Sequence, residues 1–431
     1  MKRLVYGKHL SAENLGRKVH CEWECPEQNM RLNMLFVVAS ITTNVSCLLA
    51  GTTLDRFGRR ACITIAVACL TAGSLSIASK IHLIGADGYL VGHFLLGLGG
   101  TFLFLPSFQL SNAFPEYSGI VVAMITCAFD ASAAVLSIYS LAWTTSGGTF
   151  TVSKFFLAYL AVPLAILVVE WTIMPDQPYP VMPDLERKIA DAQSRSRNIC
   201  ASNENLAGDT EERNDIAQQE AHSQAASGAW VVLQGLSASR QMRTPWFVLL
   251  LLATTLQMLR MNYFIANIKA QCSYLLGSDA DAETVNKFFD AALPIGGVAA
   301  MPLIAIILNN LSVARVLALL TAYMTMNSAL SCLPLMWACI ATVVTFVTFR
   351  PFYYATISHT AAEVFGFATF GRMYGTIICA SGLLNIFQSS LDSFTYGALR
   401  GDPTPVNIAL AVTGAVLGAA LTSYAAYQGR A

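Results

Sequence analysis

Four charged side chains lie well inside long apolar runs of this chain: Asp130, Arg260, Asp290 and Arg350. A charge inside a bilayer is costly, so each of these residues is a candidate for function. A guanidinium in a low-dielectric cavity binds a carboxylate through two hydrogen bonds, and a carboxylate accepts hydrogen bonds in turn. These residue types therefore indicate binding of a small polar solute. For each residue, an interhelical salt bridge or a gating contact is an equal alternative.

Arg260 is the strongest single candidate for a substrate ligand. It lies in the segment LRMNYFIAN, and Tyr263, Phe264 and Asn267 follow it on neighbouring turns. Aromatic and amide neighbours of this kind suit a guanidinium that binds a carboxylate. The alternative is that Arg260 snorkels to the membrane surface or pairs with an acid across the cavity.

Arg350 directly precedes Pro351, and Tyr353 follows. Proline removes a helical hydrogen bond and loosens the backbone, which suits a bending element. A structural kink and a role in gating both remain open for this pair.

A second cluster of polar residues is GTTLDRFGRR, residues 51–60, between two apolar runs. Its arginines favour the cytoplasmic side of a bilayer: Arg56, Arg59 and Arg60. Gly51 and Gly58 permit a tight reversal and close helix approach. Asp55, at a buried helix end, can face the N-terminus of a neighbouring helix, whose partial positive charge stabilises a carboxylate.

The composition is that of a polytopic membrane protein. Of 431 residues, 55% are hydrophobic and 12% are charged, which is about half the charged fraction of soluble domains. The formal net charge of zero argues against a nucleic-acid partner. The chain has no nucleotide-binding loop, nucleophile motif or metal-ligand cluster, so we expect no enzyme activity, cofactor or metal.

Most of the cysteines lie inside apolar runs, where cysteine is a small hydrophobe. A disulfide between Cys21 and Cys25, or between either of them and Cys272, is left open.

Runs of about 20 apolar residues are long enough to cross a bilayer. We predict eleven such spans, near 33–53, 61–79, 88–110, 119–142, 155–174, 246–268, 287–308, 314–332, 335–357, 371–391 and 405–427. The polar stretch 175–244 separates the first five from the last six, and its composition predicts a largely disordered linker.

The pattern G-x-x-x-D-R-x-G-R-R in residues 51–60 resembles the loop signature, motif A, of the major facilitator superfamily of secondary transporters. The resemblance implies an all-α major facilitator fold with twelve membrane helices in two pseudo-symmetric halves. It also implies a monomer in the lipid bilayer, with a small-molecule substrate. In this superfamily the motif follows helix two, whereas here it follows the first span, so we expect the first helix to be missing.

The expected organisation follows from this numbering. Residues 1–32 form an extracytoplasmic loop, 33–174 form helices two to six, 175–244 form the cytoplasmic linker and 245–431 form helices seven to twelve. In the superfamily, the four intramembrane charges would all fall on helices that line the central cavity. The resemblance implies gating by residues 51–60, with Asp55 at the cytoplasmic end of helix eleven. Asn309 takes the corresponding position in the second half, so this contact is expected on one side only.

Several segments are similar to one branch, the system-L large neutral amino acid uniporters (solute carrier family 43) and their fungal relatives. These segments are 25–60, 97–114, 244–268 and 350–392. The resemblance implies movement of neutral amino acids by alternating access. Arg260 and Asn267 would bind the carboxylate, and Asp130 or Asp290 the ammonium. The side-chain pocket would be aromatic: Tyr263, Phe264, Phe352 and Tyr353.

Two other functions remain open. The first is a proton-coupled transporter or exporter of another small solute, although His93 stands where proton-coupled members keep an arginine. The second is a non-transporting membrane receptor. Residues 1–32 have no apolar core of the kind that a cleavable signal peptide needs. The sequence is compatible with the plasma membrane and with an organelle membrane alike.

Overall fold

The computed structural model describes residues 26–79, 88–114, 117–132, 134–174, 233 and 236–429. Within these ranges every regular element is a helix, as the sequence predicts. Cys21, Cys25 and most of the predicted linker lie outside the described residues, so the pairing of these cysteines and the disorder of the linker stay predictions. The first described helix begins at Pro26, so the end of the predicted loop 1–32 is helical rather than irregular.

The first element, α2 (Pro26–Ser79), contains two of the predicted spans, 33–53 and 61–79. Gly58 separates them with φ 78° and ψ −178°, a conformation that is open to glycine and strained for other residues. The chain therefore reverses at Gly58, and the second section of α2 packs beside α3 (Gly88–Ser107).

The remaining helices of the first half are short. They are η2 (Phe108–Ala113), α4 (Ser118–Ala131), α5 (Ala134–Thr145), α6 (Val152–Tyr159) and α7 (Ala161–Thr172). α4 and α5 together cover the predicted span 119–142, and α6 and α7 cover 155–174.

The remaining helices are the short α11 at the end of the linker and the helices of the second half, most of which are longer. They are α11 (Ala238–Gln241), α12 (Pro245–Leu276), α13 (Asp279–Asn310), α14 (Val313–Leu330), α15 (Met336–Phe365), α16 (Phe370–Leu384), α17 (Phe387–Tyr396) and α18 (Thr404–Gln428). Thr244 and Ser278 cap the N-termini of α12 and α13 through their hydroxyl groups, and Gly277 ends α12 with φ 63°.

Eight helices of the described residues are long and apolar enough to cross a membrane. This number is lower than the eleven predicted spans because α2 counts once and because 119–142 and 371–391 are each divided between two shorter helices. Each predicted span nevertheless coincides with a helix or with a pair of consecutive helices.

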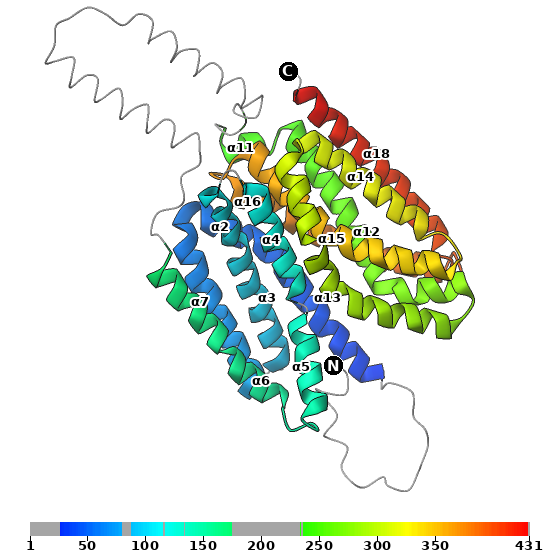
Figure 1. Ribbon diagram of the computed structural model, residues 1–431, viewed down its shortest axis with the longest axis horizontal. Helices are drawn as coiled ribbons and strands as arrows, with labels where there is room; N and C mark the ends of the chain where they lie inside the picture. The colour runs from blue at the N-terminus through cyan, green and yellow to red at the C-terminus, as the bar shows by residue number, and fades with distance from the viewer. Residues whose placement is uncertain are drawn as a thin grey trace, which may run out of the picture.

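The helices form one bundle in which the two halves lie side by side (Figure 1). Three helix pairs of the described residues make the main contacts between the halves: α2 packs on α16, and α4 packs on α13 and on α15. α15 is the most buried of the candidate spans, and its side chains make up much of the apolar core.

The two halves differ in the helices that the structure describes. In the second half, α12 packs against α13, α16 and α18. The described residues of the first half contain no counterpart of α12, and two apolar cavities of about 500 and 490 Å³ lie there beside α3.

Candidate functional site

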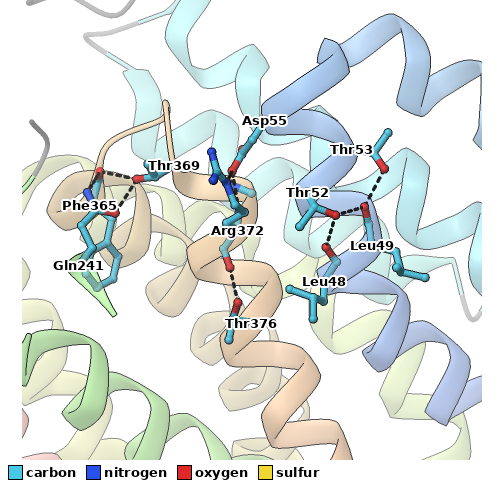
Figure 2. Close-up of polar contacts among 11 residues, drawn as sticks. Leu48, Leu49, Thr52, Thr53, Asp55, Gln241, Phe365, Thr369, Arg372 and Thr376 are labelled. Carbon is cyan, nitrogen blue, oxygen red and sulfur yellow. Dashed lines mark hydrogen bonds and ion pairs between the residues drawn. The ribbon is translucent and has the colours of Figure 1, made fainter. Parts of the chain in front are cut away.

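Asp55 joins the two halves at the side that the arginines of residues 51–60 mark as cytoplasmic. Its Oδ1 accepts a hydrogen bond from the amide of Gly371 at 3.2 Å. Its Oδ2 accepts from the amide of Arg372 at 3.0 Å and from Arg372 Nε at 2.9 Å. These donors belong to the first turn of α16, so Asp55 supplies a carboxylate to a helix N-terminus of the other half (Figure 2). We call Asp55, Gly371 and Arg372 the latch.

Glycines bring the backbones of α2 and α16 together beside the latch. A Cβ atom on Gly51 would lie 1.9 Å from the carbonyl oxygen of Gly371. Farther along the same contact, a Cβ on Gly375 would lie 2.4 Å from the carbonyl oxygen of Cys47. Gly371 and Gly375 form a G-x-x-x-G pair on α16, a spacing typical of close helix packing in membranes. The inter-half contact therefore has no room for larger residues.

The arginines of residues 51–60 differ in their surroundings. Arg59 Nη1 lies 2.7 Å from Glu170 Oε2 on α7, and the two side chains are 11% and 6% exposed. Arg60 donates to the carbonyl oxygen of Met174 at 3.4 Å and lies over the ring of Trp171, 5.1 Å from its centre. Arg56 is exposed. Arg59 and Arg60 thus tie the start of the second section of α2 to the end of α7.

Asp130 and Arg350 form a second charged contact between the halves. Asp130 lies in the last turn of α4, Arg350 lies on α15, and Asp130 Oδ1 is 3.4 Å from Arg350 Nη1. The Asp130 side chain is only 4% exposed, and its Oδ1 accepts no hydrogen bond from the described residues. We call Asp130 and Arg350 the central pair.

The predicted span that carries Asp130 is divided between α4 and α5, and residue 133 between them lies outside the described residues. α4 ends at Ala131, and the amide of Val135 donates to the carbonyl oxygen of Ser132, three residues back. The second half shows the same feature between α16 and α17, where Gln388 and Ser389 bond to carbonyls three residues back. Interrupted spans at corresponding positions of two halves are typical of solute sites in secondary transporters.

Arg260 forms an interhelical hydrogen bond with an amide, and not the pairing with an acid that the sequence left as its alternative. Its Nη2 donates to Asn327 Oδ1 on α14 at 2.8 Å, and Asn327 Nδ2 donates to Thr345 and to the carbonyl of Thr342. These residues all belong to the second half. The structure therefore does not bring Arg260 into the central pair.

Asn267 and Tyr263 connect α12 to α17. Asn267 Nδ2 donates to Asp392 at 2.6 Å, and the hydroxyl of Tyr396 donates to Asn267 Oδ1 at 3.0 Å. The hydroxyl of Tyr263 lies 2.8 Å from that of Thr395. Both predicted ligands are thus engaged in contacts within the second half.

The other predicted site residues are dispersed. Tyr353 is 1% exposed and donates to the carbonyl of Thr254 on α12. Phe264 packs with Phe289 and Phe346, at ring distances of 6.1 and 4.5 Å. Phe352 and Pro351 are buried in α15.

Asp290 is exposed on α13 and accepts a 3.4 Å hydrogen bond from Asn286. Of the predicted candidates, only Asp130 and Arg350 come together between the halves.

The sequence analysis missed several residues of these contacts. Gly371 and Arg372 carry the latch, and the G-x-x-x-G spacing of Gly371 and Gly375 was a readable signal. Asn327 and Asp392 are partners of predicted residues but follow no motif. Asn309 is exposed, and the side chain of Tyr117 does not cap α4, so the described residues contain no second latch at this position.

Cys272 lies beside Cys339, and both are free thiols in the described residues.

The comparisons with known proteins agree with this architecture. Residues 8–267 match the model of the family described as sugar (and other) transporter. Protein FMP42 of Saccharomyces cerevisiae (strain ATCC 204508 / S288c) is 34% identical over 428 residues, covering 93% of this chain and 85% of the relative. Equilibrative nucleobase transporter 1 of Bos taurus, of solute carrier family 43, is 24% identical over 432 residues, covering 93% and 84%.

Among solved structures, the chain resembles the proton:xylose symporter XylE, a major facilitator protein bound to 6-bromo-6-deoxy-D-glucose. The TM-score is 0.56 at 14% identity, over 92% of this chain and 86% of the symporter. This likeness concerns the fold. The chain is therefore a member of the sugar (and other) transporter family of the major facilitator superfamily, a multi-pass membrane transporter of a small solute and not an enzyme.

Proposed function

We propose that this protein moves neutral amino acids across its membrane by alternating access around the central pair. The observation that carries the proposal is the contact of Asp130 with Arg350 between the halves, directly before an interrupted span. A carboxylate and a guanidinium side by side match the ammonium and the carboxylate of a zwitterion. Because the pair joins α4 to α15, a solute that replaces this contact acts on both halves at once.

The latch and the glycine contacts supply the second requirement of alternating access, a closed side. The latch and the contacts of Gly51 with Gly371 hold α2 against α16 on the side assigned to the cytoplasm. Opening that side requires the Asp55 carboxylate to leave the N-terminus of α16. The arrangement supports a cycle in which solute binds at the central pair, the contacts of the latch then break, and the cytoplasmic side opens.

A nucleobase is the second candidate substrate. One relative, at 24% identity, is named as an equilibrative nucleobase transporter. The central pair favours this class as well, because oxo bases such as hypoxanthine carry a ring N–H for Asp130 next to a carbonyl oxygen for Arg350. The two classes differ in charge, since an amino acid presents two full charges and a neutral base presents none.

Uptake into proteoliposomes tests the proposal. We expect labelled leucine or phenylalanine to enter by saturable uptake that needs no ion gradient. An inward proton gradient should not stimulate this uptake. Adenine and hypoxanthine should neither enter nor compete. Saturable uptake of the bases alone favours the second candidate, and stimulation by protons favours a coupled transporter.

Variants of the central pair test whether Asp130 and Arg350 bind the transported solute. Asp130→Asn and Arg350→Gln should each raise the KM for an amino acid at least tenfold, because each removes one charge that the zwitterion needs. The matched control is Glu283→Gln, which removes an exposed acid paired with Lys269 on the surface and should leave KM unchanged. An unchanged KM in both central-pair variants overturns the site.

A further inference from the structure

The end of the linker is attached to the turn that carries the latch. Gln241, the last residue of α11, is 0% exposed. Its Nε2 donates to the carbonyl oxygens of Leu233 at 2.7 Å and of Phe365 at 3.0 Å. Its Oε1 accepts from the hydroxyl of Thr369 at 2.7 Å. One buried amide therefore binds the linker to both ends of the turn between α15 and α16 (Figure 2).

This turn leads directly to the latch. Phe365 is the last residue of α15, and Thr369 is the N-cap residue of α16. The hydroxyl of Thr369 also donates to the carbonyl of Phe365 at 3.1 Å, so Gln241 completes a small closed network. Gly371 and Arg372, which donate to Asp55, follow Thr369 within the first turn of α16.

The direction of these amides depends on how the turn is held. Hydrogen bonds weaken steeply when the donor angle departs from the line to the acceptor. Asp55 receives two backbone amides and one guanidinium N–H at once, which requires the start of α16 in one orientation. Gln241 contacts the turn from the linker, whereas Asp55 contacts α16 from the first half.

We propose that Gln241 is a positioning residue of the latch, through which the linker controls closure of the cytoplasmic side. This inference rests on the latch role proposed above. Gln241 orients the N-terminus of α16 toward Asp55. A change in the linker that removes Gln241 from the turn weakens the latch without touching the central pair.

The alkylation rate of Cys47 measures whether α2 and α16, which the latch holds together, have separated. This cysteine is 5% exposed on α2, and its carbonyl lies where α16 passes at Gly375. Separation of α2 from α16 exposes it to N-ethylmaleimide. Cys339 is also 5% exposed but lies in α15 beside α12, so its alkylation reports loosening of the second half instead. Peptide mass spectrometry measures both thiols in the full chain with all its cysteines retained.

We expect Gln241→Leu to raise the alkylation rate of Cys47 about fivefold, the factor that corresponds to about 1 kcal/mol, and to leave Cys339 unchanged. Asp55→Asn should raise the rate of Cys47 to a similar extent. The double variant should not exceed Asp55→Asn alone, because both changes act on one contact. The matched control is Gln257→Leu, which removes another buried amide of the second half and should leave Cys47 at the wild-type rate.

Three results overturn the inference. If Gln241→Leu leaves Cys47 unchanged while Asp55→Asn raises its rate, the latch stands and Gln241 has no part in it. If the effects of the two changes multiply in the double variant, or if Cys339 reacts faster together with Cys47, Gln241 acts through general stability. If Asp55→Asn itself has no effect, the proposed latch fails, and the role of Gln241 fails with it.

Discussion

The carboxylate of Asp55 lies 2.9 Å from Arg372 Nε and 3.0 Å from the amide of the same residue, although the two residues belong to different halves of the transporter. One acidic side chain therefore binds both the charge and the backbone at the start of α16. The Asp55 side chain is 2% exposed and that of Arg372 is 38% exposed. Since the guanidinium is partly solvated, the backbone amides contribute more to this contact than the ion pair does.

This difference predicts an order of effects. Asp55→Ala removes the acceptor for all three donors and should lower the free energy of unfolding by about 1–2 kcal/mol, as loss of a helix cap does. Arg372→Gln leaves the amides bonded and should cost less than about 1 kcal/mol. Thermal unfolding of the two purified variants in the same detergent measures both. An equal or larger loss for Arg372→Gln contradicts this account of the latch.

Glycine positions on α2 and α3 predict opposite outcomes for one and the same substitution. Gly51→Ala places a methyl group where the carbonyl oxygen of Gly371 would be 1.9 Å away, so the two halves must separate. We expect a loss of at least about 1–3 kcal/mol and a large fall in transport.

Gly100→Ala on α3 is the matched control, because a Cβ atom there meets nothing within 4 Å. It should raise stability by about 0.5–1 kcal/mol, since alanine favours a helix more than glycine does. Equal destabilisation by both changes would show that helix packing at Gly51 is not the cause. Melting temperature and initial uptake rate measure the two effects.

Because Arg59 and Glu170 form a buried ion pair, we expect the free energy of unfolding to depend strongly on the charges at these two positions. Both side chains are largely buried, so Glu170→Gln removes a charged partner from a buried cation and should cost about 3 kcal/mol. The double exchange Arg59→Glu with Glu170→Arg should recover part of that loss. A denaturation series of the single and double variants gives the coupling energy. Additive losses in the double variant would mean that the two charges do not stabilise one another.

Variants of Arg260 distinguish between two roles of this residue, binding of the substrate and stabilisation of the fold. If the contact with Asn327 is the role of Arg260, Asn327→Leu and Arg260→Leu should lower the melting temperature alike while leaving the KM of the transported solute unchanged. A substrate ligand behaves otherwise, because its loss raises KM whatever happens to stability. Uptake kinetics at several solute concentrations, measured with the melting temperature of the same preparations, separate the two roles.

Much of the fold was predictable because its signals are local. The apolar length of each run determines a helix whatever its neighbours are, and the predicted spans coincide with helices of the structure. The interruption between α4 and α5 was not predictable in this way. No proline or glycine marks Ser132, and the shift in hydrogen bonding there is not encoded by residue type.

The partners of the charged residues were less predictable. Asp130, Arg260, Asp290 and Arg350 share the same local signal, a charge in an apolar run. The structure pairs Asp130 with Arg350, turns Arg260 toward Asn327 and leaves Asp290 exposed. A residue turns by about 100° around a helix axis with each step along the chain, so a small rotation of the whole helix changes the neighbour of every side chain.

The sequence by itself determined the membrane helices, the family signature in residues 51–60 and the expectation that Asp55 faces a helix N-terminus. These follow from the length, composition and spacing of neighbouring residues. The family resemblance added that this N-terminus is the one of helix eleven, which the structure shows to be α16. Only the tertiary structure decided that Gln241 holds the turn before it and that Asp130 and Arg350 meet between the halves. Such contacts join residues more than a hundred positions apart, and helix packing rather than local preference selects them.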